Sequence, residues 1–441
     1  MEQTQKKNGN IIAIITMIFL FAMISFVTNL AAPIGVIWKS QPEIGGSNVL
    51  GIMGNFMNFL AYLFMGIPSG KLLVKVGYKR SAMIGIAVGF IGVLIQYLSG
   101  LSSGIPGFCI YLLGAFVSGF AVCILNTVVN PMLNLLGGGG KRGNQLNLIG
   151  GTLYALTGTL TPMLVGALIG TVTASTRMAD VNLVLFIAMT VFAAAFVVLS
   201  FIPIEDPEMG RVTAKTKFEH SPLSFRHFQL GIIAIFLYVG VEVGIPGGMN
   251  FYLSDTTSAG AWVNPESVVN AATIGGAVAA MYWLLMLIGR FFAGFIAGKV
   301  SSRTLMLCTT SLGMLLILMA ILCPKTNTVS MPLFNIMQLE FSFIVVPVSI
   351  LLLVLCGLCT SVLWSCIFNL ATEGLGKYTA QASGVFMMMV VGGGVLPVFQ
   401  NFFADRFGYM PSYFVYFLGM AYMFFYALKG SKNVNTDIPV E

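Results

Sequence analysis

Charged side chains are scarce in this chain of 441 residues. Asp, Glu, Lys and Arg together make up 8% of it, against about 25% in an ordinary soluble domain. There are two histidines, and no Gly-x4-Gly-Lys-Ser/Thr loop that could cradle nucleotide phosphates. The sequence therefore argues against a pump driven by nucleotide hydrolysis. No pairing of a nucleophile with a base is visible either, so we expect neither an enzyme nor a bound cofactor or metal.

The seven cysteines are scattered along the chain. Cys356 and Cys359 have the Cys-x-x-Cys spacing that is typical of a metal or redox pair. They lie in an apolar segment with no second pair and no histidine nearby. We interpret them as small packing residues.

Long apolar segments dominate what is present. Hydrophobic residues make up 57% of the chain, the mean hydropathy is +0.92, and about 20 apolar residues are enough to cross a bilayer. The sequence therefore predicts an all-α membrane protein with twelve transmembrane helices. The predicted spans are Ile11–Ile37, Val49–Leu72, Ser81–Leu101, Phe108–Leu135, Leu146–Ile169, Asn182–Pro203, Leu230–Leu253, Asn270–Phe295, Leu305–Cys323, Phe343–Leu370, Gln381–Phe403 and Tyr413–Leu428.

Basic residues predict the orientation. With both termini placed in the cytoplasm, most of the twenty-two Lys and Arg fall on the inner side, which is the positive-inside pattern and fits an even number of spans. We expect a multi-pass protein of the cell inner membrane, embedded in the lipid bilayer. The net charge of +7 then reflects topology and not nucleic-acid binding. The first span is too long for a signal peptide and lacks an Ala-x-Ala site, so we expect it to be retained.

The longest internal polar stretch, from Glu205 to Gln229, divides the spans six and six. We predict an N-terminal six-helix bundle over residues 1–203, a cytoplasmic linker over 204–229 and a C-terminal six-helix bundle over 230–441. Both histidines, His220 and His227, fall in the linker. A solvated connection is a simpler interpretation of this stretch than a histidine switch.

Glu242 and Arg290 are the two charged residues that hydropathy places well inside a span. A carboxylate at bilayer depth costs at least about 2.5–3.5 kcal/mol on insertion scales, so it needs a partner or a wet cavity. The alternative to a functional Glu242 is a protonated side chain in a structural hydrogen bond between helices. Arg290 could bind an anionic substrate. Because it lies near the cytoplasmic end of its span, within reach of water, we expect a structural or gating contact instead.

Neutral amides near mid-span describe a candidate binding site. In lipid such groups need partners, so they face the bundle interior or a cavity. Amides both donate and accept hydrogen bonds, as the hydroxyls of a polyol do, and aromatic faces suit the apolar side of a sugar ring. The alternative is an interhelical hydrogen bond for each amide and ordinary packing for each aromatic. The candidates are Asn29, Asn55, Asn58, Asn126, Asn130, Asn369 and Gln400, with Tyr238, Tyr282, Trp283 and Trp364.

The loop between the second and third spans is Gly-Lys-Leu-Leu-Val-Lys-Val-Gly-Tyr-Lys-Arg, starting at Gly70. It resembles the signature loop of the major facilitator superfamily, Gly-x-Leu-x-Asp-Arg-x-Gly-Arg-Lys/Arg. Gly70, Leu72, Gly77 and Lys79 match, while Lys75 replaces the Arg and Val74 the acid. The resemblance implies two six-helix bundles around a central site, and gating or structural roles for Gly70, Lys75, Gly77 and Lys79.

Four stretches of the C-terminal half resemble the fucose–galactose–glucose proton symporter family within that superfamily. They are Tyr-Val-Gly-Val-Glu-Val from Tyr238, Tyr-Trp-x4-Ile-Gly-Arg-Phe from Tyr282, Gly-Leu-Gly-Lys-Tyr-Thr-x-Gln-x-Ser-Gly from Gly374, and Gly-Gly-Gly-Val-Leu-Pro-x2-Gln-x3-Ala-Asp from Gly392. The second of them contains Arg290, which supports a structural or gating role for that residue.

The N-terminal half departs from this family. Asn29 stands where members carry an acid in the first span, and Asn126 stands at a polar position of the fourth span that is Glu or Gln in members. In the fifth span Gly150 and Leu153 replace a Gln and an Asn. Glu242 is then the one carboxylate left at mid-membrane depth, and we expect it to carry the coupling proton.

The resemblance implies a transporter that imports a sugar or similar polyol by alternating access, coupled to a cation. We expect a proton, with a sodium ion as the competitor, and a monomer. The alternatives are an exchanger or exporter of another small metabolite or organic anion, or an uncoupled facilitator. A receptor or a membrane-embedded enzyme would be a different class. The predicted substrate-binding residues are Asn29, Asn126, Asn130, Glu242, Tyr282, Trp283, Trp364, Asn369 and Gln400.

Overall fold

The computed structural model describes residues 2–136, 140–202, 220–254, 271–296, 300–335, 340–375, 378–435 and 438. Among these residues, twelve helical segments are long and apolar enough to cross a membrane. The predicted class, an all-α membrane protein with twelve transmembrane helices, is confirmed. The boundaries at 203 and 230 stay predictions: most of the predicted linker lies outside the described residues, and its last residues, 226–229 with the buried His227, are part of a helix that begins at Arg226.

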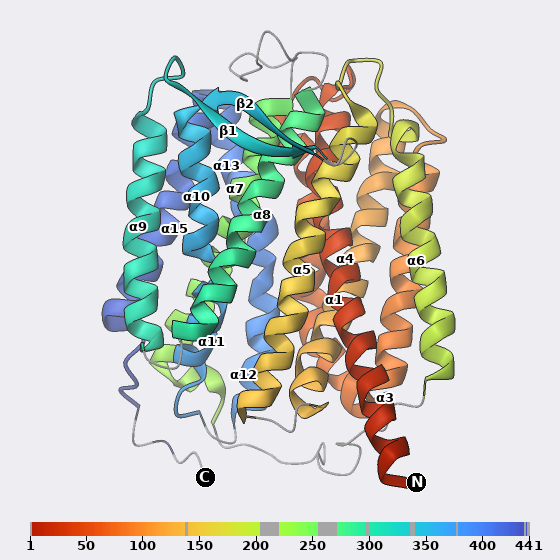
Figure 1. The fold of residues 1–441 in the computed structure, drawn as a ribbon, viewed down its shortest axis with the longest axis vertical. Helices are drawn as coiled ribbons and strands as arrows, with labels where there is room; N and C mark the ends of the chain where they lie inside the picture. Colours follow the sequence, from red (N-terminus) through yellow and green to blue (C-terminus); the bar gives the residue numbers. More distant parts are fainter. Residues whose placement is uncertain are drawn as a thin grey trace.

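The N-terminal half supplies six spans (Figure 1). Two of these spans lie within one helix, α3. Gly77 is the one residue of α3 whose backbone angles are not helical, and it lies close to where the two spans meet. The elements are α1 (Glu2–Ser40), α2 (Asn48–Gly51), α3 (Met53–Ser99), α4 (Gly104–Leu136), α5 (Gly140–Ile169), the short η1 (Met178–Val181) and α6 (Asn182–Phe201).

The C-terminal half supplies the other six spans, several of them broken into shorter helices. Glycines accompany the breaks at Gly392 and Gly408, because glycine weakens a helix, whereas α10 and α11 separate at Ser361 and Val362, where neither glycine nor proline is present. The elements are η2 (Pro222–Ser224), α7 (Arg226–Ser254), α8 (Ala271–Ile296), α9 (Ser302–Leu322), α10 (Val348–Thr360), α11 (Leu363–Thr372), α12 (Thr379–Met388), η5 (Met389–Val391), α13 (Gly392–Phe407), α14 (Tyr409–Ser412), α15 (Phe414–Phe425) and η6 (Tyr426–Gly430).

A β-hairpin lies between α9 and α10, and it was not predicted. Strands β1 (Thr328–Asn335) and β2 (Glu340–Pro347) pair antiparallel, with Thr328 opposite Pro347 and Asn335 opposite Glu340. The start of the tenth predicted span, Phe343, is therefore wrong, because the helix begins at Val348. Residues of β2 are apolar on both faces, so hydropathy alone counted them into the span that follows.

The two ends of the molecule differ, and both chain termini lie at one of them. Helix α1 begins and η6 ends at the lower end in Figure 1, which we call the terminal end. The hairpin β1–β2 lies across the upper end, which we call the hairpin end. The N-terminal helices gather on one side of the view and the C-terminal helices on the other, with α5 and α8 side by side between them.

Helices α5 and α8 hold the two halves together on one side. Near the hairpin end the Thr273 hydroxyl donates to the Gly166 carbonyl at 3.0 Å, and the Ala272 backbone N–H donates to the Gly170 carbonyl at 2.9 Å. A Cβ atom on Gly166 would collide with the Ala272 carbonyl oxygen. Glycine is therefore what allows the two backbones to approach this closely. On the other side of the molecule, α3 packs against α12 and α13.

Candidate functional site

An ion pair joins two candidate spans of the C-terminal half. The Arg290 Nη2 of α8 donates to the Glu242 Oε1 of α7 at 3.1 Å. The two side chains are 19% and 11% exposed, respectively. The sequence required either a partner or a wet cavity for Glu242, and the structure shows a partner. A charge at this depth needs a partner, and Arg290 supplies it from the neighbouring helix.

The same guanidinium extends to the other half of the molecule. Its Nη1 lies 3.5 Å from the Gly151 carbonyl oxygen of α5, at the outer limit of a hydrogen bond. Arg290 therefore stands between an acid of its own half and a backbone acceptor of the opposite half. This placement favours the gating role predicted for it over anion binding, because its charge is already matched by Glu242.

Aromatic side chains surround the ion pair. The Tyr238 ring packs edge-to-face on Trp364 at 6.2 Å between centroids, and Trp283 contacts both Tyr282 at 5.8 Å and Tyr154 of α5 at 6.4 Å. Tyr238 is fully buried, and its hydroxyl faces the charges without meeting hydrogen-bond geometry to either. The predicted aromatics Trp364 and Trp283 thus pack on tyrosines: Trp364 on Tyr238, and Trp283 on Tyr282 and Tyr154.

A small polar cavity adjoins this cluster on the side of the hairpin end. Asn29 of α1, Asn55 of α3 and Asn250 of α7 line it together with Trp283 of α8. Its volume is about 20 Å³, room for about one water molecule. The remaining lining residues are Thr28, Ala32, Pro33, Pro162, Val243, Pro246, Gly247 and Ala279. Both halves contribute walls, so relative motion of the halves would change its size.

Each of the three amides has one end engaged in the protein. The Asn29 Nδ2 donates to the Ser25 carbonyl at 2.9 Å, and the Asn55 Nδ2 donates to the Gly393 carbonyl at 2.8 Å. The Asn250 Oδ1 accepts from the Ser254 hydroxyl at 2.6 Å. Among the described residues, the carbonyl oxygens of the first two and the NH₂ of Asn250 have no partner. The cavity therefore offers two acceptors and one donor group.

Asn250 was missed by the sequence reasoning. Along α7, Pro246 lies four residues after Glu242, and Asn250 lies four residues after Pro246, so all three share one face of the helix. That spacing was the available signal. Asn55, in contrast, was among the predicted mid-span amides, and the structure brings it to the cavity.

Other predicted site residues lie closer to the terminal end. Asn126 Nδ2 donates to the Tyr62 hydroxyl at 2.7 Å, and Asn130 Nδ2 donates to the Asn126 carbonyl at 3.0 Å; both residues are half-buried on α4. On α11, Ser365 and Asn369 are exposed while the opposite face is buried. An exposed polar face within a span that met lipid would lose its hydrogen bonds. We therefore expect this face of α11 to meet water and not lipid.

Two further predicted residues have their polar groups engaged inside the C-terminal half. Gln400 is fully buried: its Nε2 donates to the Ser412 hydroxyl at 2.6 Å, and its Oε1 accepts from Asn401 at 3.0 Å. The Tyr282 hydroxyl lies 2.8 Å from the Thr360 hydroxyl. Neither residue lines the polar cavity, so the structure does not bring them together with Asn29 and Asn250.

The loop with the signature sequence connects the second and third spans of the chain, which both lie in α3, and its structure accounts for two of its residues. Gly77 is buried with φ 82° and ψ 174°, a conformation that only glycine adopts without strain. Lys79 Nζ donates to the Ser200 carbonyl at the end of α6, at 3.0 Å. Lys75 is exposed, and the position of a Cβ on Gly70 is open. Gly77 and Lys79 therefore have structural roles within the N-terminal half.

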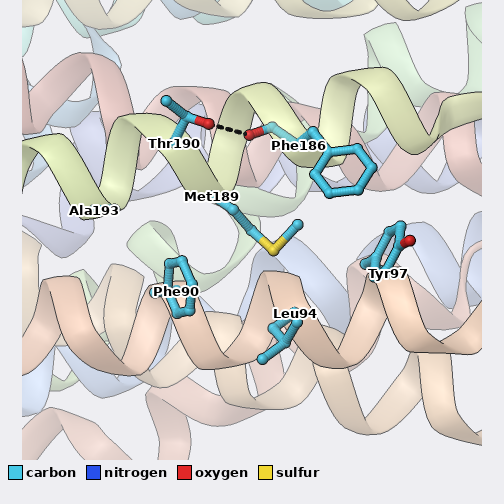
Figure 2. Close-up of a pocket in the computed structure, with 7 residues that line it drawn as sticks. All are labelled: Phe90, Leu94, Tyr97, Phe186, Met189, Thr190 and Ala193. Atoms are coloured by element: carbon cyan, nitrogen blue, oxygen red, sulfur yellow. Dashed lines mark hydrogen bonds between the residues drawn. The ribbon is translucent and has the colours of Figure 1, made fainter.

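A larger groove lies elsewhere, on the membrane-facing surface between α3 and α6 (Figure 2). Its volume is about 410 Å³, and it is lined by Phe90, Leu94, Tyr97, Phe186, Met189, Thr190 and Ala193. The Thr190 hydroxyl is already bonded to the Phe186 carbonyl at 2.8 Å. The groove thus offers little to a polar solute and suits acyl chains of the bilayer. Among the described residues, no group of three or more His, Cys, Asp or Glu could hold a metal ion.

Sequence relatives are sugar transporters by name. The chain is 27% identical over 385 residues to a glucose/galactose transporter of Brucella abortus, covering 86% of this chain and 84% of that protein. It is 26% identical over 441 residues to a putative glucose/galactose transporter of Helicobacter pylori, covering 97% and 99%. It is 21% identical over 385 residues to the L-fucose-proton symporter of Escherichia coli, covering 80% and 78%.

Structural and family comparisons agree. The crystal structure of the fucose:proton symporter of E. coli in its outward conformation superposes with a TM-score of 0.66 at 17% identity, covering 96% of this chain and all of that one. A bacterial homologue of the lysosomal transporter Spinster, in an inward-facing conformation, gives 0.60 at 14% identity, covering 95% of this chain and 94% of that one. The family model described as Major Facilitator Superfamily matches residues 13–398. The chain therefore belongs to the Major Facilitator Superfamily, and it is a membrane transporter and not an enzyme.

Proposed function

We propose that this protein imports a hexose-like sugar by alternating access, and that Glu242 couples the transport to protons. The observation that carries the proposal is the arrangement at the centre of the molecule. An amide-lined cavity with an indole wall lies between the two halves, directly beside an intramembrane carboxylate paired with an arginine. Relatives named for glucose, galactose and fucose–proton transport support the same substrate class.

The cavity has the chemistry that a sugar needs. The free acceptors on Asn29 and Asn55 match hydroxyl donors, and the Asn250 NH₂ matches hydroxyl acceptors. Trp283 presents an aromatic surface to the same space. In the described conformation the cavity is too small for a hexose, so binding requires the two halves to separate along it. Asn250 thus joins the predicted substrate-binding residues.

The ion pair suggests how a proton is coupled to that movement. When Glu242 is ionised, its carboxylate accepts from Arg290 and keeps the guanidinium in the C-terminal half. When a proton binds the Glu242 carboxylate, the attraction between the two groups falls. Arg290 is then free to strengthen its long contact with the Gly151 carbonyl of the N-terminal half. Protonation of one residue would thereby change which half holds the arginine.

The release path would run toward the terminal end. The half-buried Asn126 and Asn130 of α4 and the exposed Asn369 of α11 supply polar groups along it. We propose that this end faces the cytoplasm, as the basic residues predict, and that the protein acts as a monomer in the bacterial inner membrane. The described conformation is then open toward the inside.

Two observations weigh against the rival functions. An organic anion would need an uncompensated cation, and Arg290 already has Glu242. An uncoupled facilitator would not need to keep a charged pair at a depth where each charge is costly. Sodium remains the competing ion, because a carboxylate with nearby amide oxygens also suits a hard cation.

Purified protein in liposomes tests the proposal. Vesicles preloaded with unlabelled glucose, galactose or fucose should take up the labelled sugar by counterflow, and a pH gradient should drive accumulation that a proton ionophore abolishes. A thermal-shift screen over neutral sugars, sugar acids and nucleosides should show stabilisation by neutral sugars, since a ligand of the folded state raises its apparent stability. Exchange of sugar acids without exchange of neutral sugars would refute the proposed substrate class.

A further inference from the structure

Four residues form a polar cluster across the two halves at the hairpin end. Lys39, at the end of α1, is 1% exposed. Its Nζ lies 2.5 Å from the Asn48 Oδ1 of the same half and 2.6 Å from the Tyr409 hydroxyl of the C-terminal half. The Tyr409 hydroxyl also donates to the Asn48 Oδ1 at 2.7 Å. The fourth member, Asp405, lies at the end of α13.

Asp405 directs its hydrogen bonds to the opposite half. Its Oδ1 accepts from the Asn48 backbone N–H at 2.9 Å, and its Oδ2 accepts from the Ser47 hydroxyl at 3.1 Å and the Val49 backbone N–H at 3.2 Å. These donors belong to the first turn of α2, where backbone N–H groups have no partner within the helix. A carboxylate of one half therefore completes the start of a helix of the other half.

Apolar and cation–π contacts close the same end. Lys39 Nζ lies 5.6 Å from the centroid of the Phe251 ring on α7. Tyr252 packs edge-to-face on Tyr409 at 5.4 Å. The hydrogen bonds of α5 with α8 described above lie at this end too. In contrast, Ser365 and Asn369 of α11 are exposed toward the terminal end, and Asn126 and Asn130 of α4 are half-buried there.

We propose that Lys39, Asn48, Asp405 and Tyr409 form a latch that holds the hairpin end closed and thereby stabilises the conformation open toward the terminal end. Opening that end would separate every one of the contacts that cross between the halves. The latch uses residues remote from Glu242 and the polar cavity, so it sets the balance between conformations and takes no part in sugar or proton binding. It depends on the fold of the superfamily and not on the identity of the substrate.

Hydrogen–deuterium exchange of the whole protein in detergent or nanodiscs tests the latch without added labels. In Asp405→Asn and in Tyr409→Phe, backbone exchange in the segments around residues 36–56 and 245–254 should become about tenfold faster, because charge-assisted bonds across the interface are lost. At the same time exchange around residues 363–372 of α11 should become slower, because the terminal end closes when the hairpin end opens.

A matched control is available in Asp180. Its carboxylate also accepts a backbone N–H at the hairpin end, from Arg177 at 2.8 Å, but within the N-terminal half. Asp180→Asn should change exchange locally and leave α11 unchanged. The latch is refuted if both latch variants exchange like the parent protein. It is refuted equally if they loosen the hairpin end without protecting α11, which is what simple local destabilisation would do, or if Asp180→Asn reproduces their pattern. Should one latch variant not fold, the other decides.

Discussion

The Glu242 carboxylate and the Arg290 guanidinium lie 3.1 Å apart, on two neighbouring helices that are both candidate membrane spans. Each charge makes the other tolerable in a place where either one alone would be costly. Arg290 also approaches a backbone carbonyl of the opposite half at 3.5 Å. A pair placed in this way links the state of one carboxylate to the contact between the two halves.

The first prediction concerns the arginine. Arg290→Ala leaves the Glu242 carboxylate without its partner, and removing one member of a buried pair costs about 3 kcal/mol, at the lower end of the usual range because both side chains are slightly exposed. We expect a clear fall in the melting temperature of the solubilised protein. The double variant Arg290→Ala with Glu242→Gln should recover a large part of that loss. Equal losses in the single and double variants would show that the pair does not stabilise the fold.

The second prediction separates amides that face the cavity from amides that do not. Asn250→Ala and Asn29→Ala should raise the KM for sugar about 5- to 100-fold, because a hydroxyl of the ligand loses a partner worth about 1–3 kcal/mol. Gln400→Ala is the matched control, since its amide is engaged with Ser412 and Asn401. It should lower the melting temperature and leave KM close to that of the parent. The opposite pattern would place the sugar at Gln400 and away from the cavity.

The third prediction compares two glycines of the same signature loop. Gly77→Ala forces a side chain onto a backbone with φ 82°, at a cost of about 1–3 kcal/mol, so the melting temperature should fall. Gly70→Ala lies in the helical part of α3, where a Cβ meets open space. It should be neutral or slightly stabilising, by up to about 1 kcal/mol. Similar effects of the two substitutions would contradict the structural role assigned to Gly77.

The membrane topology was predictable because it depends on local composition. A span of about 20 apolar residues is visible in any window along the sequence, and the twelve spans were found on this basis. The hairpin was not, because Phe343 and Val345 are apolar although they are exposed, at 73% and 44%, and an apolar strand next to an apolar helix has no boundary in hydropathy. Polar and apolar residues alternate only over Glu340–Phe343, which is too short a stretch to identify a strand.

The site was predictable in its residue types and only partly in its geometry. That Glu242 needs a partner follows from its depth in the membrane, but the partner lies 48 residues away on another helix. Gln400 and Asn29 have the same chemistry in the sequence. One is bonded within its own half and the other lines the cavity, and this difference depends on helix rotation, which hydropathy does not report. Asn250 could have been found from its spacing to Glu242.

The most direct test of the account is the Glu242→Gln variant in liposomes, measured in two assays on the same preparation. Counterflow reports binding and the movement of the loaded carrier, and it needs no ion gradient. Accumulation driven by an imposed pH gradient reports coupling. The parent protein should perform both, and replacing sodium in the buffer should not change its accumulation, whereas a proton ionophore should abolish it.

We expect Glu242→Gln to lose gradient-driven accumulation and to keep most of its counterflow, because the amide keeps the shape of the side chain but cannot exchange a proton. Loss of both activities would make Glu242 a ligand of the sugar and not the proton carrier. Accumulation equal to that of the parent protein would contradict the proposed coupling outright.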